Sequence, residues 1–315
     1  MTARVTSLLF AALTCAGCVD LDFTIHNGKH CSTYGAQTCD VDDPWDRLCT
    51  PCDEPFDWAR EVPWPEGSTA RAVTDARQER VPSYDGEGEL DAYFIPAHGE
   101  RPELADTTIM YFHGNRYGLE HYAPRVRVLH EAGYAVFAVD YRGYGKSEPE
   151  SWPTAAQWFD DAEALRGRLD ELGVDLTRVV YYGYSIGAFP AIDLAGRRPA
   201  CAVVLEAPCP GVDPMVAESS LTSVPGSFLA TGDYDNIRKL GEIEQPLFIL
   251  HGELDSTFSI EQSQSLYEAA AGPKRFWKIP DANHGLSEGT VETAGNTIYF
   301  ERIEDFLGEL APTCL

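Results

Sequence analysis

The sequence predicts an α/β fold in which helices flank a mostly parallel sheet of about eight strands. Short apolar runs, each ended by Gly, Pro or an acidic turn, recur from about residue 71 onward, as expected of strands buried on both faces. Longer stretches with helical spacing separate these runs, and such alternation favours a parallel sheet with crossover helices. With 44% hydrophobic residues among 315, the chain can bury a core of this size.

The expected strands and helices follow one another in regular order. The first strand, ELDAYFIPA, alternates apolar and polar residues, which predicts a position at the edge of the sheet. The buried strands are TTIMYFHG, YAVFAVDYRG, RVVYYGYS, CAVVLEAP and PLFILHGE, and the last strand is RFWKIP. Helices are expected in LEHYAPRVRVLHEAG, TAAQWFDDAEALRGRLDELG, SIGAFPAIDLAGRR, IEQSQSLYEAAAG and TIYFERIEDFLGEL.

Composition divides the chain into three parts. Residues 1–17 predict a signal peptide, because a basic start is followed by an apolar run too short to span a bilayer. Residues 18–70 form a lipid-anchored, cysteine-rich segment, and residues 71–315 form the α/β domain. Within that domain, residues 208–245 are rich in Pro, Gly, Ser and Thr and are too long for an ordinary connection. They predict a small cap over the carboxyl edge of the sheet, where ligands bind in open α/β folds.

The sequence Cys15-Ala16-Gly17-Cys18 resembles a bacterial lipobox, in which Cys18 becomes the lipidated first residue of the mature protein. Cys15 stands where lipoproteins usually have leucine, so ordinary secretion is the alternative. Val19 follows where an aspartate would signal retention at the inner membrane. The resemblance therefore implies anchoring to the outer membrane, facing the periplasm or the surface.

The N-terminal cysteines predict disulfides. Four of them lie within 22 residues of an exported chain, which favours two disulfides with three possible pairings; they are Cys31, Cys39, Cys49 and Cys52. Zinc is the alternative, but only one pair has the two-residue metal spacing and no histidine lies between or just after them. We therefore expect no metal.

The remaining cysteines admit a geometric prediction. Cys201 and Cys209 bracket one extended strand, so they lie roughly 25 Å apart at ~3.3 Å per residue, beyond disulfide reach. The last helix is expected to return to the amino edge of the sheet, which predicts a Cys201–Cys314 disulfide. Cys209 is then either a thiol or joined to the N-terminal cysteines.

The charge balance bears on partners. The chain has 24 basic and 50 acidic residues, a formal net charge of −26, which opposes binding to nucleic acid or to an anionic lipid surface. Such a charge also simply keeps a protein soluble. We expect no nucleic-acid partner, and the oligomeric state stays open.

Residues 183–187, Gly-Tyr-Ser-Ile-Gly, lie between a predicted strand and a predicted helix. A serine at such a sharp turn projects its hydroxyl above the sheet, and Gly183 and Gly187 give the room that the turn requires, with Tyr184 preceding the serine. A lone serine hydroxyl is a poor nucleophile, so a base and an orienting acid are needed. The pattern therefore predicts Ser185 as the nucleophile.

Asp255 and His284 follow the next-to-last and the last predicted strands. Both residues should lie at the same sheet edge as Ser185, in the chain order Ser, Asp, His. Glu206, which ends CAVVLE, is the alternative acid, although support of a loop is its expected role. His113 and His251, each followed by glycine at a strand end, are expected to be structural.

An oxyanion hole needs two N–H groups aimed at the developing negative charge. The amide of Ile186, at the start of the helix after Ser185, supplies one. The amide of Asn115, in the loop after TTIMYFHGN, is expected to supply the other.

These motifs together resemble the α/β-hydrolase superfamily, over about residues 72–310. The chain is most similar to the branch of serine-aminopeptidase-like hydrolases and protein depalmitoylase-like thioesterases. The N-terminal cysteine segment has no counterpart in this resemblance. The motifs that carry it are FHGN, DYRGYGKSE, YGYSIGAFPAIDLA, YDNIRKL, HGELD and ANHG.

The resemblance implies an exported serine hydrolase that cleaves an ester, thioester or amide of a small-molecule or acylated substrate, without a cofactor. The aromatic candidates for contact with such a substrate are Tyr117, Tyr184, Phe228 and Phe258, and core or surface positions are the equal alternative for each. One alternative is a non-catalytic surface lipoprotein that uses the scaffold for binding. Another is a haloperoxidase or lyase on the same fold.

Overall fold

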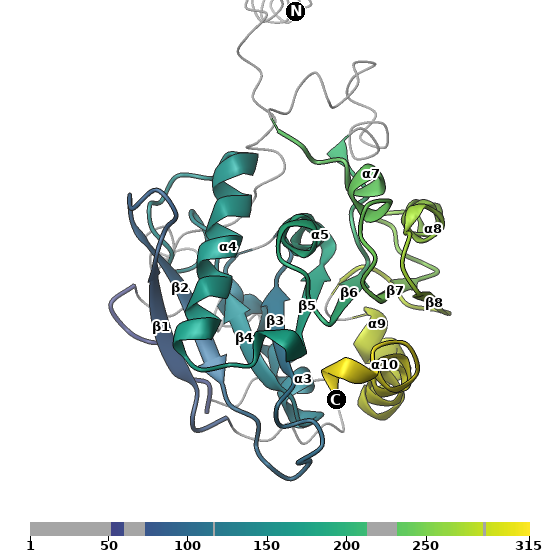
Figure 1. The fold of residues 1–315 in the computed structure, drawn as a ribbon, viewed down its shortest axis with the longest axis horizontal. Coiled ribbons are helices and arrows are strands. Elements are labelled where there is room, and N and C mark those ends of the chain that lie inside the picture. Colours follow the sequence, from purple (N-terminus) through teal and green to yellow (C-terminus); the bar gives the residue numbers. More distant parts are fainter. Residues whose placement is uncertain (1–51, 60–72, 116, 213–231, 286–287) are drawn as a thin grey trace, which may run out of the picture.

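The computed structural model describes residues 52–59, 73–115, 117–212, 232–285 and 288–315. An eight-stranded sheet with the order β1-β2-β4-β3-β5-β6-β7-β8 runs through the molecule (Figure 1). The strand pairs from β4 to β8 are all parallel. Strand β2 is antiparallel to both of its neighbours, β1 and β4. The mostly parallel sheet predicted from the sequence is confirmed.

Strands β2 through β8 coincide with runs predicted from the sequence, whereas the polar strand β1 was not predicted. Every residue of β3 through β7 is buried, as expected of strands covered on both faces. The strands are β1 (Arg77–Pro82), β2 (Glu89–Ile95), β3 (Thr108–Phe112), β4 (Ala135–Val139), β5 (Val179–Tyr184), β6 (Ala202–Glu206), β7 (Leu247–Gly252) and β8 (Lys274–Ile279).

The prediction that ELDAYFIPA forms an edge strand is wrong. This segment is β2, which lies between β1 and β4, and all of its residues after the first are buried. The polar residue that suggests alternation, Asp91, is 1% exposed. It accepts a hydrogen bond from Gln78 (2.6 Å) and lies 3.3 Å from the guanidinium of Arg80, both on β1. The alternation thus reflects a buried polar group instead of a solvent-facing one, and the polar strand β1 forms the edge.

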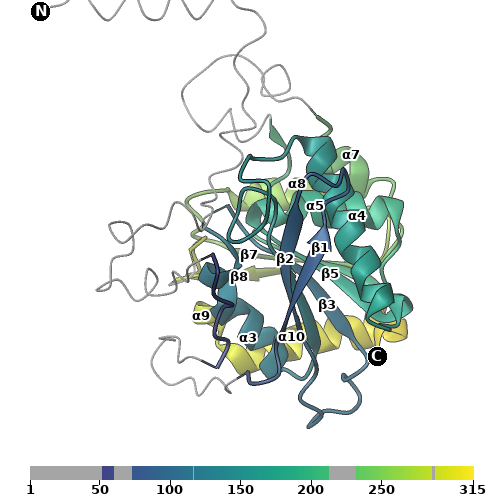
Figure 2. The same cartoon turned by 90° about the vertical axis from the view of Figure 1, so that its left-hand side faces the viewer.

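The helices cover both faces of the sheet (Figure 2). Helices α4, α5, α7 and α8 lie on one side of it, and α3, α9 and α10 lie on the other. All helices expected from the sequence are present, whereas α7 and α9, at five residues each, are too short for a periodic signal. The helices are η3 (Leu119–Tyr122), α3 (Ala123–Glu131), α4 (Ala155–Glu171), η4 (Leu176–Arg178), η5 (Ser185–Gly187), α5 (Ala188–Arg197), α7 (Asn236–Leu240), α8 (Ile260–Ala269), α9 (Thr290–Ala294), α10 (Asn296–Leu310) and η7 (Pro312–Cys314).

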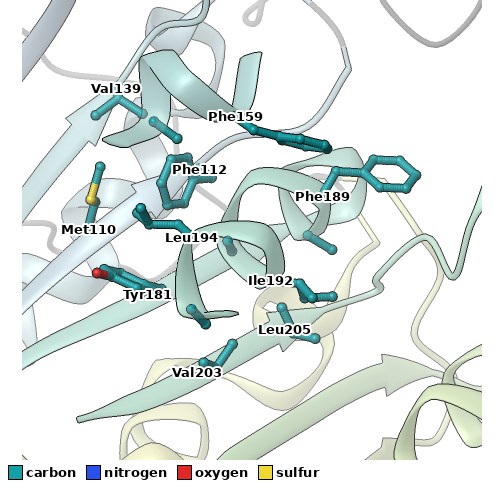
Figure 3. Close-up of a cluster of buried hydrophobic side chains, with 14 of the residues drawn as sticks. Met110, Phe112, Val139, Phe159, Tyr181, Phe189, Ile192, Leu194, Val203 and Leu205 are labelled. Carbon is teal, nitrogen blue, oxygen red and sulfur yellow. The ribbon is translucent and has the colours of Figure 1, made fainter. Parts of the chain in front are cut away.

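Apolar packing fixes α5 on the sheet (Figure 3). Phe189, Ile192 and Leu194 of α5 are fully buried and belong to one core cluster with the side chains of β3, β5 and β6. Burying side chains of this size stabilises the fold by about 1.5–3 kcal/mol each. Because the end of β5 leads directly into η5 and α5, this packing also holds residue 185 at the carboxyl edge of the sheet.

The structure contains the predicted disulfide between Cys201 and Cys314, with their Cα atoms 5.4 Å apart. It joins the start of β6 to η7, so the last helix does return to the amino edge. Cys52 is also disulfide-bonded. Cys209 is fully buried, and its thiol donates to the carbonyl of Gly211.

Several other predictions fall outside the described residues. They are the signal peptide, the lipidated Cys18, and the cysteines Cys31, Cys39 and Cys49. Residues 213–231 of the predicted cap are outside as well, while α7 lies within its C-terminal part. In the part of the chain that the structure describes, no helix combines the length and the apolar character needed to cross a membrane.

Candidate active site

Ser185 is the first residue of η5 and occupies a strained turn directly after β5. Its φ is +56°, in the left-handed region that non-glycine residues rarely adopt. Two flanking glycines permit the turn. A Cβ on Gly187 would lie 2.2 Å from the carbonyl oxygen of Phe112 on β3, and one on Gly183 would lie 2.6 Å from the carbonyl oxygen of Gly187. Both glycines are therefore required by close approach of neighbouring backbone.

The structure brings the three residues of the predicted triad together. Ser185 Oγ lies 2.9 Å from His284 Nε2, and His284 Nδ1 lies 2.8 Å from Asp255 Oδ2. The Asp255 side chain is completely buried, whereas that of His284 is 15% exposed. The imidazole thus bridges a buried carboxylate and a hydroxyl at the carboxyl edge of the sheet.

Asp255 is held in its ionised form by the groups around it. Its Oδ1 accepts hydrogen bonds from the backbone N–H groups of Thr257 (2.8 Å) and Phe258 (2.9 Å). Burial alone would raise the pKa of this carboxyl, but the contacts with His251 and His284 outweigh burial and hold the pKa well below its usual range. A permanently charged acid is what an orienting group for His284 requires.

His251 contacts the triad acid directly, which its sequence position alone did not predict. Its Nε2 lies 3.2 Å from Asp255 Oδ2 and 2.9 Å from the carbonyl oxygen of Phe258. Because that carbonyl only accepts, Nε2 carries a proton, and Nδ1 lies 2.7 Å from the Ser263 hydroxyl oxygen. His251 is therefore structural, as expected, and what it supports is the acid.

Glu206, the alternative acid, is engaged elsewhere. It is fully buried at the end of β6, where it accepts from the hydroxyls of Tyr182 and Thr290 and lies 3.1 Å from Arg125 Nη2. These partners belong to β5, α9 and α3. Glu206 thus anchors α9, the helix that follows the His284 loop, which agrees with its expected supporting role.

Asn283 joins the two loops that carry the acid and the base. Its side-chain oxygen accepts from the backbone N–H groups of His284 (2.8 Å) and Ser256 (3.1 Å). The backbone N–H of Asn283 donates to the carbonyl of Glu288 at 2.6 Å. One carboxamide therefore fixes the spacing between residue 284 and the residue after Asp255.

Tyr184 contacts His284 through both its hydroxyl and its ring. Its hydroxyl donates to the carbonyl oxygen of His284, and the two rings stack with centroids 5.6 Å apart. Burial raises the pKa of Tyr184 well above its usual range, so the hydroxyl remains a donor. At 4% exposed, Tyr184 is buried beside His284.

The other aromatic candidates differ in position. The Phe258 ring is buried and meets the His284 ring edge-on at 5.3 Å. Tyr117 packs against His121, with ring centroids 5.0 Å apart. Phe228 lies outside the described residues.

The predicted oxyanion donors lie on adjacent strand ends. Ile186 is in the first turn of η5, where N–H groups have no partner within the helix. Asn115 follows β3, and β3 pairs with β5 so that Phe112 is opposite Gly183. The Asn115 side chain accepts from the Tyr144 hydroxyl at 3.0 Å, which fixes the loop that carries its amide.

His113 braces this loop from inside. It lies 2.9 Å from Asp140 through Nε2, and its carbonyl accepts from the Tyr141 hydroxyl at 2.8 Å. These contacts give His113 a structural role. Among the residues that the structure describes, no cluster of three or more His, Cys, Asp or Glu side chains is arranged to hold a metal ion.

Comparisons with known proteins point to one family. Residues 104–231 match the family model of serine aminopeptidases of the S33 group. The uncharacterized protein YfhR of Escherichia coli K12 is 30% identical over 232 residues, which cover 69% of this chain and 76% of YfhR. The human alpha/beta hydrolase domain-containing protein 17B is 29% identical over 211 residues, which cover 65% of this chain and 67% of that protein.

A solved structure agrees at the level of the fold. The esterase Pf2001 of Pyrococcus furiosus superposes with a TM-score of 0.60 at 22% identity, covering 75% of this chain and 93% of the esterase. At this identity the likeness establishes the architecture, and the chemistry must be argued from the residues themselves.

Proposed function

The chain belongs to the α/β-hydrolase superfamily, and we propose that it is a serine hydrolase that cleaves a carboxylic ester or thioester through an acyl-enzyme. The observation that carries the proposal is the continuous contact from Ser185 Oγ through His284 to Asp255, at 2.9 and 2.8 Å. Nucleophile, base and orienting acid within hydrogen-bond reach are the arrangement that acyl transfer requires.

In the proposed reaction, His284 Nε2 takes the proton of Ser185 as the hydroxyl attacks the substrate carbonyl. The ionised Asp255 stabilises the imidazolium that forms and keeps Nδ1 protonated. The imidazolium then gives its proton to the leaving group, and water hydrolyses the acyl-enzyme by the same steps in reverse. His251 and the amides of residues 257 and 258 keep Asp255 in place throughout.

The negative oxygen of the tetrahedral intermediate needs donors that are already positioned. We assign this role to the amides of Ile186 and Asn115, at the ends of neighbouring strands. Loss of one such donor typically costs about 3 kcal/mol in the transition state.

The names of similar proteins support two kinds of bond as the substrate. The structural neighbour is named an esterase, whereas the matching family model is named for serine aminopeptidases. Amide cleavage is therefore the second candidate, and a small apolar or acylated substrate is proposed for either bond.

We propose further that the protein is exported and anchored through a lipid on Cys18. The Cys201–Cys314 disulfide and the disulfide-bonded Cys52 support export, because disulfides persist in oxidising compartments. The N-terminal residues that would carry the signal and the lipid support it at the level of sequence only.

A fluorophosphonate probe tests the catalytic proposal. The wild-type protein should be labelled, Ser185→Ala should not, and Ser265→Ala, at an exposed position of α8, should be labelled like the wild type. A panel of p-nitrophenyl esters of increasing chain length, acyl thioesters and aminoacyl amides then identifies the bond. A wild-type protein that resists the probe, or equal labelling of Ser185→Ala, would favour the non-catalytic binding lipoprotein.

A further inference from the structure

Two residues of the segment 52–59, here named the N-terminal segment, are packed into a hydrophobic core cluster of the hydrolase. Phe56 and Trp58 are 5% and 3% exposed, and the Trp58 ring contacts the Tyr93 ring of β2, with centroids 5.4 Å apart. The N–H of Phe56 donates to the Tyr93 hydroxyl at 2.9 Å, and Arg127 of α3 donates to the carbonyl of Trp58. The segment lies before the predicted domain boundary at residue 71, yet it is part of the folded body.

Lys146 connects this segment to the loop structure around the site. The side chain is almost completely buried, and its ammonium lies 3.1 Å from the Glu120 carboxylate of η3 and donates to the carbonyl of Glu54 in the N-terminal segment. Arg80 donates to the backbone carbonyl of Lys146 at 2.8 Å. A buried ammonium needs all of its partners, because any partner that moves leaves the charge uncompensated. The Lys146 ammonium therefore links the N-terminal segment, η3 and the loop that carries Lys146.

Lys146 belongs to residues 140–147, here named the β4 loop, and this loop supports the proposed oxyanion donor. The hydroxyl of Tyr144 donates to Asn115 Oδ1 at 3.0 Å. The hydroxyl of Tyr141 donates to the carbonyl of His113 at 2.8 Å. Two side chains of the β4 loop thus form hydrogen bonds with residues 113 and 115.

The backbone of the β4 loop also packs against the segment after Asn115. A Cβ on Gly118 would lie 2.3 Å from the Cα of Gly145, the residue before Lys146. Asp140 accepts from the N–H of Leu119 at 2.6 Å. With contacts this close, a shift of the β4 loop at residues 145 and 146 must move the chain on either side of Asn115.

We propose that Lys146 is a positioning residue through which the N-terminal segment holds the β4 loop and, with it, the oxyanion donor Asn115. The inference rests on the proposed function for its catalytic consequence. It assigns a role to the cysteine-rich extension, which has no counterpart in the resemblance to the family. Cys52, two residues before Glu54, is disulfide-bonded.

Kinetics on the full chain test the proposal. Lys146→Met removes the bridge, and Phe56→Ala loosens the N-terminal segment without touching the β4 loop. Each should lower kcat for a p-nitrophenyl ester about 10-fold with KM nearly unchanged, since complete loss of an oxyanion donor costs about 10²–10³ in kcat. The double variant should be little worse than either single variant, because both act through one contact.

Lys239→Met is the matched control. Lys239 is similarly buried and also joins a carboxylate, Asp193 at 2.7 Å, to a backbone carbonyl, that of Asp233, but it does so on α7. Its loss should lower thermal stability as much as the loss of Lys146 does, while kcat per folded molecule stays at the wild-type level.

Hydrogen exchange supplies a readout that needs no activity. Amides of residues 113–122 should exchange faster in Lys146→Met and Phe56→Ala than in the wild type and Lys239→Met. If exchange there is unchanged, or if kcat falls equally in Lys146→Met and Lys239→Met, the positioning role is wrong. If exchange is faster in the two variants but the fluorophosphonate probe does not label the wild-type protein, the positioning role of Lys146 stands and the proposed function is wrong.

Discussion

At the carboxyl edge of the sheet, Ser185, His284 and Asp255 are held by hydrogen bonds between loops, whereas at the amino edge the end of the chain is held by a covalent bond. The carboxyl edge carries a strained serine and buried charges, among them Asp255, Lys146 and Glu206. Strain and buried charge usually cost stability and persist where a function needs them.

The amino edge has the opposite character. The Cys201–Cys314 disulfide is reinforced there by Thr107 and Arg178, both of which donate to the carbonyl of Cys314. Cys201, Thr107 and Arg178 directly precede β6, β3 and β5, respectively. They therefore lie at the end of the strands that is remote from Ser185. The comparison leads us to expect that changes at the carboxyl edge affect activity more than stability, and that changes at the amino edge do the reverse.

The largest effect should come from the base. His284→Ala removes the group that takes the proton of Ser185, and we expect kcat to fall about 10⁴-fold, as for other serine hydrolase triads. The melting temperature should change little, because the imidazole is partly exposed. Asp255→Asn should give a loss of similar size. Ester hydrolysis by His284→Ala at more than a tenth of the wild-type rate would contradict the assignment.

Breaking the covalent tie should have the reverse outcome. Cys201→Ser opens a loop of 113 residues, for which the chain-entropy model gives about 4–5 kcal/mol of lost unfolding free energy. Urea unfolding measures this loss, and activity per folded molecule should be unchanged. Cys314→Ser and the double variant are the controls, and a double variant clearly less stable than either single one would mean that the thiols act separately.

A smaller effect is expected where loops of the carboxyl edge are joined. Asn283→Ala leaves two backbone N–H groups without their acceptor, and kcat should fall about 10-fold, since a lost hydrogen bond costs on the order of 1 kcal/mol. Tyr184→Phe keeps the stacked ring and loses one hydrogen bond, so its loss should be smaller. KM should stay constant in both, and a rise in KM alone would assign these residues to substrate binding.

A pH dependence of stability is expected at Asp91, beside the carboxyl end of β4. Burial and the negative charge of Asp140 raise its pKa to about 7, against the opposing influence of Arg80, Gln78 and Lys146. The folded protein therefore binds more protons here than the unfolded chain, whose aspartates titrate near ~3.9, and this group lowers stability as the pH rises between these values.

Asp91→Asn removes this dependence. Relative to the wild type, the variant should gain unfolding free energy between pH 5 and pH 8, as measured by urea unfolding. Asp255 has the opposite sign, because its pKa is lowered: its contribution is complete above the pKa of the unfolded chain and is lost only at strongly acidic pH. If the free energy of unfolding depends on pH in the same way in the variant and the wild type across this range, ionisation of Asp91 does not destabilise the fold and the prediction is wrong.

Local pattern predicted much of the fold and of the candidate site. Apolar runs of strand length locate the buried strands, and the residues that follow β5, β7 and β8 are the ones that the structure brings together at one edge. The prediction of an edge strand failed at β2, because the sequence does not distinguish a buried, paired aspartate from an exposed one. It also gave no sign of the supporting contacts of His251, Asn283 and Tyr184.

The sequence by itself determined the buried strands and the longer helices, the sharp turn at Ser185 and the order of the three polar residues, because each depends on neighbours along the chain. Only the tertiary structure decided which groups hold them in place. Ser256 and Asn283 are 27 residues apart, and Glu54 and Lys146 are 92 apart. Such contacts depend on how loops pack after the sheet has formed, and no local periodicity encodes that packing.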